Sequence, residues 1–404
     1  MSRPDRTLTL TNATVLTPGS AKPKPGWVRI TGDRIVAVGG AGKPRARGGQ
    51  GRSAQSGRTG QLDTIYDCRG RTVAPGYVDM HVHGGGGGAF TSGDPDEARE
   101  VARFHRRHGT TSIMASLVTA PIPELTKAIA ELAGLVEAGE LAGLHLEGPY
   151  LSRARCGAHN PAYLRKPDLN EVKGLIEAGR GTIKMITVAP ELPGATELIE
   201  HCVAAGVVVA VGHTDATYSE TRLALAAGAR VATHLYNGMR GQHHREPGPP
   251  TALLAAADVV VELINDGVHL HDAVIGVTFD AIGADRVALI TDAMAAAGVG
   301  DGLYPLGPMT VRVTDGVARV LGQGGAIAGS TLTMERAVAR TVDVAGVRVA
   351  DAITAASHTP ARVLGLADRI GSIATGKQAD LLLLDENMAV CKVMVKGRWQ
   401  SAIG

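Results

Sequence analysis

Residues 77–83 have the sequence YVDMHVH, a short apolar run that ends in two histidines. Similar runs, each typical of a buried β-strand, carry further potential metal ligands at or near their ends: Glu147 in GLHLE, His213 in VVVAVGH, His234 in RVATHLYN and Asp292 in ALITD. Strands that bring such groups to one rim are typical of barrel enzymes, which keep their chemistry at the carboxyl ends of the strands. This pattern favours a barrel hydrolase.

The alternation of strand-like and helix-like segments supports the same fold. Eight apolar runs occur in order: YVDMHVH, SIMASLV, GLHLE, KMITVAP, VVVAVGH, RVATHLYN, VVVELIND and RVALITDA. Segments with helical periodicity, such as 95–108 and 123–139, lie between them. Near-continuous apolar strands separated by helices indicate a parallel sheet whose outer face is covered. We therefore predict an α/β fold, a closed (β/α)8 TIM-like barrel.

The two ends of the chain are predicted to form a small β-domain together. Residues 7–17 and 27–40 alternate like strands, with Gly32-Asp33 as a hairpin turn. The tail 379–399 is also strand-like and has no partner in the barrel. Residues 309–321 are expected to form a hairpin inserted after the eighth strand. We expect three segments: 1–72 and 366–404 in a small β-sandwich domain, and 73–365 in the barrel.

Composition gives no support for a nucleic-acid-binding, membrane-binding, disulfide-rich or secreted protein. The 404 residues have a net charge of +2, which gives no general argument for nucleic acid or membrane partners. Four scattered cysteines without a CxxC pair disfavour a disulfide framework or a cysteine zinc site. The N-terminus lacks the apolar region of a secretory signal, so we expect a reduced, cytoplasmic protein. The Gly-, Arg- and Ser-rich segment at about 41–60 has no aromatic residues for base stacking, and we expect a solvated, disordered loop there.

The potential ligands are expected to meet in one metal site. His81 and His83 lie two residues apart, so a strand projects both from the same face. A carboxylate such as Glu147 is costly to bury at the end of an apolar strand unless it has a partner. The predicted ligands share a location at strand carboxyl ends and are Glu147, His213, His234, His81, His83 and Asp292.

This set of ligands suits one or two divalent ions per subunit. Imidazole and carboxylate both suit Zn²⁺, and Fe, Co or Mn are alternatives. Six groups exceed the needs of one tetrahedral zinc, whereas two ions bridged by Glu147 would use them all. Asp292 would then act as the general base beside the attacking water. Such a site suits amide hydrolysis, because a bound ion lowers the pKa of water to about 7 and a carboxylate can pass the proton to the leaving amine.

Three other histidines are expected to have ordinary roles. His105 and His108 lie on a helix face that we expect to be solvated. His145 shares the inward direction of Glu147 but lies deeper, which favours a place in the barrel core. Cys156, in a loop near His159, is more consistent with an ordinary loop thiol than with a site residue.

The sequence resembles the amidohydrolase superfamily and, within it, the N-acetylglucosamine-6-phosphate deacetylases. The matching segments run through nearly the whole chain: APGYVDMHVHG, GLHLEGPYL, GAHNPAYLR, VGHTDATY, THLYNGM, REPG, NDGVHL, TDAM, AGSTLTM and GSIATGKQADLLLLD. The resemblance implies that Glu147, His213 and His234 bind metal and that Asp292 is the catalytic acid/base. Some members of the family have HxN at the first strand and hold one metal, whereas HxH here favours the two-metal form.

The resemblance also implies substrate contacts and a partner. The implied contacts are His159 at the acetyl carbonyl or a sugar hydroxyl, Asn237 and Gly238 at the phosphate end, His269 at a ring hydroxyl, and Arg245 at the phosphate. In the family this arginine reaches the active site of the neighbouring subunit, which implies a homodimer. The planar fork of an arginine suits a phosphate because it donates two hydrogen bonds. The nearby Arg240, His243 and His244 leave the choice of phosphate-binding residue open.

The implied reaction converts N-acetylglucosamine 6-phosphate to glucosamine 6-phosphate and acetate in amino-sugar catabolism. N-acetylgalactosamine 6-phosphate is an alternative substrate, because the two sugars differ at one hydroxyl. A hydrolase of N-acyl-amino acids or cyclic amides is a more distant alternative. A non-catalytic sugar-phosphate sensor on the same barrel is a further alternative, which the presence of Asp292 disfavours.

Overall fold

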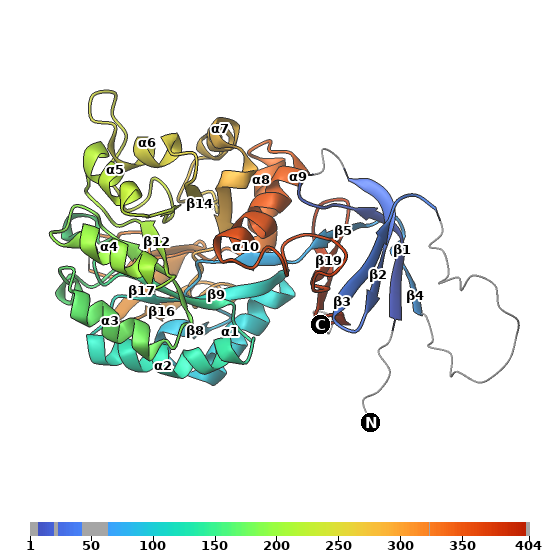
Figure 1. Cartoon of the computed structure of the whole chain (residues 1–404), viewed down its shortest axis with the longest axis horizontal. Helices are drawn as coiled ribbons and strands as arrows, with labels where there is room; N and C mark the ends of the chain where they lie inside the picture. Colours follow the sequence, from blue (N-terminus) through green and yellow to red (C-terminus); the bar gives the residue numbers. More distant parts are fainter. Residues whose placement is uncertain (1–6, 20–22, 43–63, 323, 401–404) are drawn as a thin grey trace, which may run out of the picture.

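The computed structural model describes residues 7–19, 23–42, 64–322 and 324–400. Figure 1 shows two parts side by side: a helix-covered barrel and a smaller sheet that contains the N-terminal strands. The Arg- and Gly-rich segment expected to be disordered lies, from residue 43 onward, outside the described residues.

The barrel is a parallel sheet of eight strands in the order β15-β14-β13-β12-β11-β10-β9-β6. Along the chain these strands are β6 (Tyr77–Asp79), β9 (Thr110–Val118), β10 (Gly143–Glu147), β11 (Ile183–Val188), β12 (Val208–Val211), β13 (Val231–Ala232), β14 (Val260–Ile264) and β15 (Val287–Ile290). The first and last strands meet just past their ends, where the backbone N–H of Asp292 donates to the carbonyl of His81 over 2.9 Å. The hydroxyl of Thr291 also donates to Asp79 over 2.5 Å.

Helices surround this sheet, as the predicted alternation requires (Figure 1). They are α1 (Pro95–Arg107), α2 (Ile122–Glu137), α3 (Leu169–Ala178), α4 (Ala195–Ala204), α5 (Tyr218–Ala226), α6 (Gly248–Ala255), α7 (Asp272–Ile282), α8 (Met334–Asp343), α9 (Val349–Ile353) and α10 (Thr359–Val363). A π-helical turn, η5 (Thr354–His358), joins the last two, and short 3-10 turns are η1 (Phe90–Ser92), η2 (Arg153–Arg155), η3 (Pro161–Tyr163) and η4 (Ala284–Arg286). Helix starts follow local sequence: the Asp94 side chain accepts from the backbone at Asp96 and Glu97 ahead of α1.

The chain ends pair in a single mixed sheet in the order β21-β20-β19-β5-β1-β2-β3, with β4 also paired to β1. Its strands are β1 (Thr7–Val15), β2 (Lys24–Thr31), β3 (Arg34–Gly39), β4 (Thr64–Asp67), β5 (Thr72–Pro75), β19 (Leu381–Leu384), β20 (Val390–Val395) and β21 (Arg398–Trp399). The predicted pairing of the two termini and the hairpin at Gly32-Asp33 are therefore confirmed. The exact segment limits given above stay a prediction.

Strand β19 joins the hydrophobic cores of the two parts. Because side chains alternate along a strand, Leu381 and Leu383 pack in the core of the terminal sheet. Leu382 and Leu384 pack in the core of the barrel. All four are buried, and burying one leucine side chain contributes about 1.5–3 kcal/mol. A run of four leucines is explained by a strand buried on both faces.

The insertion after the eighth strand is a three-stranded antiparallel sheet. The predicted hairpin is present as β17 (Met309–Thr314) and β18 (Val317–Val320). A third strand, β16 (Gly302–Leu306), pairs with β17 and was not predicted, since its sequence GLYPL contains a proline and lacks strand alternation. A further short pair, β7 (Gly84–Gly85) and β8 (Gly88–Ala89), follows the HxH segment.

The prediction of a solvated His105 is wrong. His105 is fully buried, and its Nε2 lies 2.9 Å from the carbonyl oxygen of Gly84. The residue continues the buried stripe of α1 formed by Ala98 and Val101, at helical spacing. Burial lowers the pKa of His105 to about 4. Gly85 permits this packing, because a Cβ there would lie 2.7 Å from His105 Nε2.

His108 has a less solvated position than expected, with its Nδ1 3.0 Å from a carboxylate oxygen of Glu335. His145 is buried inside the barrel, as predicted. Within the described part of the chain, the helices are too short or too polar to cross a membrane.

Candidate metal centre and active site

The predicted ligands lie at the carboxyl rim, but mostly just past the strands and not within them. Only Glu147 is part of a strand, as the last residue of β10. Contrary to prediction, β6 ends at Asp79, before the two histidines of HxH, and β13 ends at Ala232, before His234. Three ligands adopt the left-handed backbone conformation, with φ values of 46° at His213, 28° at His234 and 48° at Asp292. Such strain is common at functional sites, where it directs side chains that a regular strand could not.

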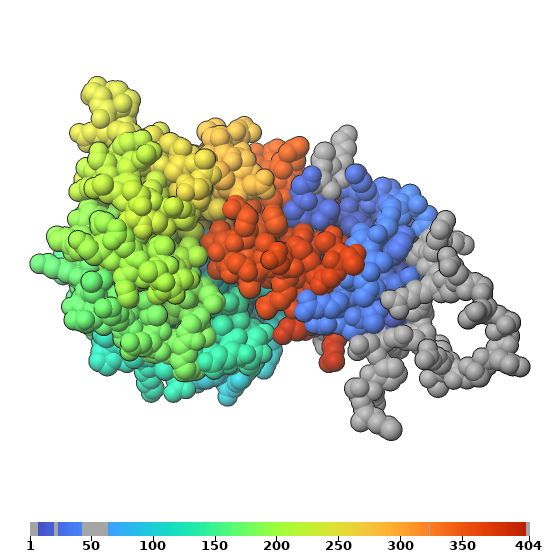
Figure 2. Space-filling view, in the orientation of Figure 1, coloured from blue at the N-terminus to red at the C-terminus, as the bar shows by residue number. Residues whose placement is uncertain are grey.

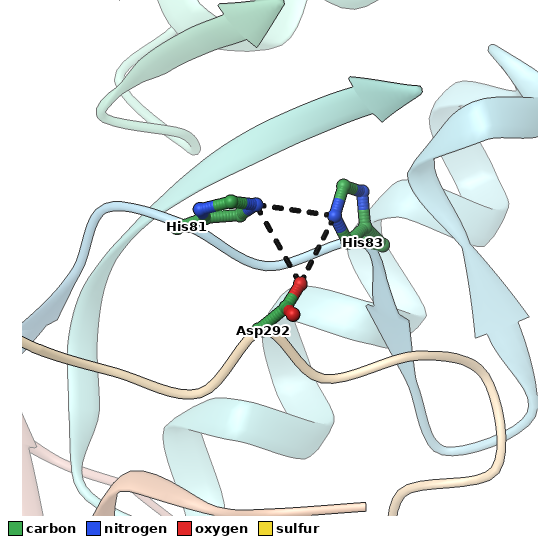
Figure 3. Close-up of side chains that lie close together, drawn as sticks. All are labelled: His81, His83 and Asp292. Atoms are coloured by element: carbon green, nitrogen blue, oxygen red, sulfur yellow. Dashed lines mark hydrogen bonds and ion pairs between the residues drawn. The ribbon is translucent and has the colours of Figure 1, made fainter. Parts of the chain in front are cut away.

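One set of ligand atoms, the His81 group, consists of His81, His83 and Asp292. Figure 3 shows their side chains pointing toward one another, the two histidines from the segment after β6 and Asp292 from the loop after β15. Their ligand atoms all lie within 4.8 Å of one another. The Nε2 atoms of the two histidines are 3.2 Å apart, and Asp292 Oδ1 lies 3.1 Å from His83 Nε2.

A second set, the Glu147 group, consists of Glu147, His213 and His234, again with ligand atoms within 4.8 Å of one another. Glu147 Oε1 lies 3.0 Å from His213 Nε2 and 3.1 Å from His234 Nε2. Its other oxygen, Oε2, lies 3.2 Å from His83 Nε2 in the His81 group. One carboxylate therefore contacts both groups, as the two-metal hypothesis requires.

The hydrogen bonds of the ring Nδ1 atoms place a proton on that nitrogen in three ligand histidines. His213 Nδ1 faces the carbonyl of Arg155 at 2.9 Å, and His234 Nδ1 faces that of Asn237 at 3.2 Å. His83 Nδ1 faces the carbonyl of Ser116 at 3.1 Å. Since a carbonyl only accepts, each Nδ1 carries a proton, so each ring turns its Nε2 toward the site and offers a lone pair there in its neutral form.

The Nε2 atoms of two of these rings converge. Those of His213 and His234 are 3.1 Å apart, and in their neutral forms neither ring has a proton there to donate. Two acceptors at this distance repel each other unless a cation lies between them. Imidazole nitrogens and carboxylate oxygens that converge in this way are the donor set of a divalent transition metal. The residues present therefore fit a metal site.

The electrostatics of the site keep its carboxylates ionised. Burial by itself raises the pKa of Asp292, but the imidazoles of His81 and His83 outweigh it and hold that pKa at about 2. Burial likewise acts against the charged form of Glu147, but His159, His81 and His213 hold its pKa well below the usual range. Asp292 is thus a carboxylate near neutral pH and can accept a proton.

A cavity of about 270 Å³ opens directly over both groups. Four of the expected substrate contacts line it, namely His159, Asn237, Gly238 and His269. The backbone must approach closely at Gly238, because a Cβ there would lie 3.1 Å from His213 Nδ1. Leu306, from the inserted sheet, and Ile327, from the loop after it, also line the cavity.

His159 is arranged to donate a hydrogen bond into this cavity. The backbone N–H of Thr119 donates to His159 Nδ1 over 3.3 Å, so the ring proton is on Nε2. Burial lowers the pKa of His159 to about 4 and keeps the ring neutral. Its Nε2 lies 3.2 Å from Glu147 Oε2, at the metal end of the cavity.

His269 is held by an acidic neighbour. Its Nδ1 lies 2.7 Å from Asp266 Oδ2. Burial acts to lower the pKa of His269, but the Asp266 carboxylate outweighs it and raises that pKa. Asp266 therefore holds the Nδ1 side of the ring and favours its charged form, and His269 lines the cavity.

Arg245 does not line the cavity of its own chain. It is exposed, and its guanidinium lies 2.7 Å from His244 Nε2. Arg240 is paired inside the chain, with its guanidinium 2.9 Å from Asp215 Oδ2. Cys156 is partly buried, and its carbonyl accepts from the backbone N–H of His159 over 3.0 Å.

Sequence reasoning missed Glu262, a fully buried carboxylate in β14. Its Oε2 lies 3.0 Å from His81 Nδ1. The signal was present in the sequence, because VVVELI places a charged residue inside an apolar run just as GLHLE does. The signal was overlooked because Glu262 lies in the middle of its strand and not at the end.

Comparison with known proteins agrees with this geometry. The sequence profile described as "Amidohydrolase family" matches residues 72–400. The chain belongs to the amidohydrolase family. Among relatives in this family, an N-acetylglucosamine-6-phosphate deacetylase of Vibrio furnissii is 38% identical over 330 residues, covering 81% of this chain and 82% of the relative. An N-acetylgalactosamine-6-phosphate deacetylase of Escherichia coli O157:H7 is 38% identical over 333 residues, covering 81% and 88%.

Solved amidohydrolase structures extend the likeness to the whole fold. A complex of the N-acetyl-D-glucosamine-6-phosphate deacetylase of Mycobacterium smegmatis with N-acetyl-D-glucosamine-6-phosphate has a TM-score of 0.88 and 45% identity, covering 98% of this chain and 99% of that one. The match includes both the barrel and the terminal sheet. The predicted amidohydrolase-type barrel, with a companion domain built from both ends, is therefore confirmed.

Proposed function

We propose that the protein is a metal-dependent deacetylase that hydrolyses N-acetylglucosamine 6-phosphate to glucosamine 6-phosphate and acetate. The observation that carries this proposal is the pair of facing imidazole Nε2 atoms beside an ionised Asp292, at the base of a cavity of about 270 Å³. The 45% identical deacetylase from Mycobacterium smegmatis, solved with this sugar phosphate, supports the choice of substrate.

The metal-binding residues would be the His81 group and the Glu147 group, with Glu147 shared between two ions. We propose Zn²⁺ as the ion, since its preference for imidazole and carboxylate matches the donor set. A divalent cation supplies an acidified water near neutral pH and polarises the amide carbonyl.

The residues of this chain then perform the proton transfers. His159 donates from Nε2 to the carbonyl oxygen, which becomes negatively charged when water attacks. Asp292 accepts a proton from that water as the new C–O bond forms. Asp292 then returns the proton to the nitrogen as the C–N bond breaks, so the products are a free amine and acetic acid, which loses its proton to become acetate. Asn237, Gly238 and His269 hold the sugar phosphate so that its acetamide reaches the base of the cavity.

Acetate release from a small panel of substrates tests this function. We expect the highest kcat/KM for N-acetylglucosamine 6-phosphate and a lower value for N-acetylgalactosamine 6-phosphate. The N-acetylglucosamine sugar without its phosphate should be poorer still, because its phosphate contacts are lost. No acetate from the first substrate with metal-loaded protein would reject the proposal, and a preference for the second would assign the galacto enzyme instead.

We also propose a homodimer in which Arg245 reaches the phosphate in the neighbouring active site. The segment between β13 and α6, which contains Arg245, projects from the surface in yellow-green in Figure 2. Arg240 is already paired with Asp215 and so is the weaker candidate. This arrangement would explain why an exposed arginine on a projecting loop lies outside its own cavity.

Arg245→Gln is expected to raise KM for the phosphorylated substrate by about 10- to 100-fold, since a charge-assisted hydrogen bond contributes about 1.5–3 kcal/mol. The kcat should change little, because the phosphate is bound equally before and during the reaction. Arg222→Gln, at an exposed position of the nearby α5, is the control. An unchanged KM in Arg245→Gln, or a monomer by light scattering, would contradict the shared site.

A further inference from the structure

Glu262 is a buried carboxylate that contacts both groups of metal ligands without belonging to either. Its Oε2 lies 3.0 Å from the Nδ1 of His81, in the His81 group. The same oxygen accepts a hydrogen bond of 3.1 Å from the backbone N–H of His234, in the Glu147 group. Its other oxygen, Oε1, has no hydrogen-bond partner among the described residues. A carboxylate left this incompletely satisfied is costly to bury, so packing alone does not explain it.

The contact to His81 differs in kind from those of the other ligand histidines. The rings of His83, His213 and His234 are each oriented by a neutral backbone carbonyl. Only His81 is oriented by a carboxylate. A carboxylate behind an imidazole fixes the ring and makes its other nitrogen a stronger metal ligand. Glu262 therefore strengthens the His81 group specifically.

The contact to His234 acts on the backbone. His234 has a φ of 28°, a strained conformation for a residue with a side chain. The hydrogen bond from its N–H to Glu262 Oε2 helps to hold this conformation. The side chain of His234 then points its Nε2 at Glu147. A change in Glu262 thus reaches the second group through the position of His234.

A neighbouring buried residue shows what an ordinary polar core residue looks like here. His145 also points into the barrel, and its ring packs edge-on against His81 with centroids 4.6 Å apart. Its two nitrogens are satisfied by the hydroxyls of Ser116 and Thr187, at 3.0 and 2.9 Å. Neither nitrogen of His145 contacts a predicted metal-binding residue, whereas Glu262 contacts His81 through one oxygen and, among the described residues, has no hydrogen-bond partner for the other.

We propose that Glu262 is a positioning residue that couples the two metal subsites, strengthening the His81 group through its charge and the Glu147 group through the backbone of His234. This inference rests on the two-metal form of the proposed function. It adds a residue that binds neither metal nor substrate but sets the relative affinities of the two subsites.

Titration with Zn²⁺ against a competing chelator tests the coupling, and it needs no substrate. His213→Asn leaves only the His81 group complete, and His83→Ala leaves only the Glu147 group complete. Each background is combined with Glu262→Gln, which keeps the shape and loses the charge, or with Glu262→Asp, which keeps the charge and withdraws it by one methylene. Thr341→Val is the control, because it removes a buried hydrogen bond to Asn265 beside β14 without touching either group.

In the background with the intact His81 group, Glu262→Gln is expected to raise the Kd for Zn²⁺ by about 10- to 100-fold. In the other background it should raise the Kd by less than about threefold, since the amide oxygen still accepts from His234. Glu262→Asp should weaken both subsites, because its oxygens no longer reach either donor. Thr341→Val should change neither Kd.

An unchanged Kd for the His81 group in folded Glu262→Gln would overturn the proposal. Equal losses in both backgrounds for Glu262→Gln would also overturn it, because they would indicate a general structural role. A wild-type protein that binds a single equivalent of Zn²⁺ would overturn the coupling but not the deacetylase activity, which the substrate panel measures separately. If Glu262→Gln does not fold, Glu262→Asp provides the test. An unchanged Kd for Zn²⁺ at either subsite in that variant would overturn the proposal.

Discussion

Asp292→Asn is expected to lower kcat by about 100- to 10,000-fold, the usual contribution of a general acid–base group. An amide has nearly the shape of the carboxylate but can neither accept the proton from water nor return it to the leaving amine. Asparagine also tolerates the left-handed φ of 48° at this position better than most residues, so the backbone should be retained. The Glu147 group is untouched, so the variant should still bind metal. Steady-state kinetics and metal analysis of one preparation measure both effects.

The matched control is Asp315→Asn. Asp315 has nearly the same φ, 51°, but lies in the turn between β17 and β18, away from the cavity. This variant should keep wild-type kcat. A kcat for Asp292→Asn within about twofold of wild type would exclude the acid–base role and would revive the sensor alternative.

Removal of metal is expected to abolish turnover and to lower stability together. A ligand that binds only the folded state stabilises it by about 2.7 kcal/mol when its concentration is about 100 times its Kd. In this protein the loss of stability should arise at the rim, where the imidazole nitrogens of His213 and His234 face each other at 3.1 Å. Dialysis against a chelator, followed by melting curves and an acetate assay with and without added Zn²⁺, measures both.

The control for metal removal is the double variant His213→Asn/His83→Ala, in which both ligand groups are incomplete. Added Zn²⁺ should raise its Tm far less than that of wild type. Full turnover by chelator-treated wild type, with no residual metal by elemental analysis, would exclude a metal-dependent reaction.

Most of the fold could be predicted because its signals are local and repeated. Each barrel strand is an apolar run, a helix separates each barrel strand from the next, and the tail 379–399 had no partner in the barrel. The strand ends were less predictable. His81, His83 and His234 looked like strand residues because their neighbours are apolar, but tertiary contacts set where each ladder stops. The burial of His105 was missed because a histidine among arginines looks solvated, although its helical spacing from Ala98 and Val101 places it inward.

The metal-binding residues could be predicted for a physical reason. That reason does not apply to the residues that orient them. Glu147 and Asp292 close apolar runs in the sequence, where a carboxylate needs a partner, and the barrel geometry brings the ends of such runs together. Glu262 makes its contacts from the middle of a strand, and no pattern in the sequence indicates that its partner is His81. Likewise, the proton positions on His159 and His213 depend on a backbone N–H and a carbonyl from other loops.

Strand β19 has a consequence for how the polypeptide matures. It pairs with β5, some three hundred residues earlier in the chain, and its leucines face two separate cores. During synthesis the ribosome makes β19 long after β5, so until then both the nascent barrel and the early strands β1 to β5 lack the apolar layer between them. Contacts this distant in sequence form slowly, because a long loop must close first. Both apolar cores therefore stay exposed to aggregation until β19 has been made and has paired with β5.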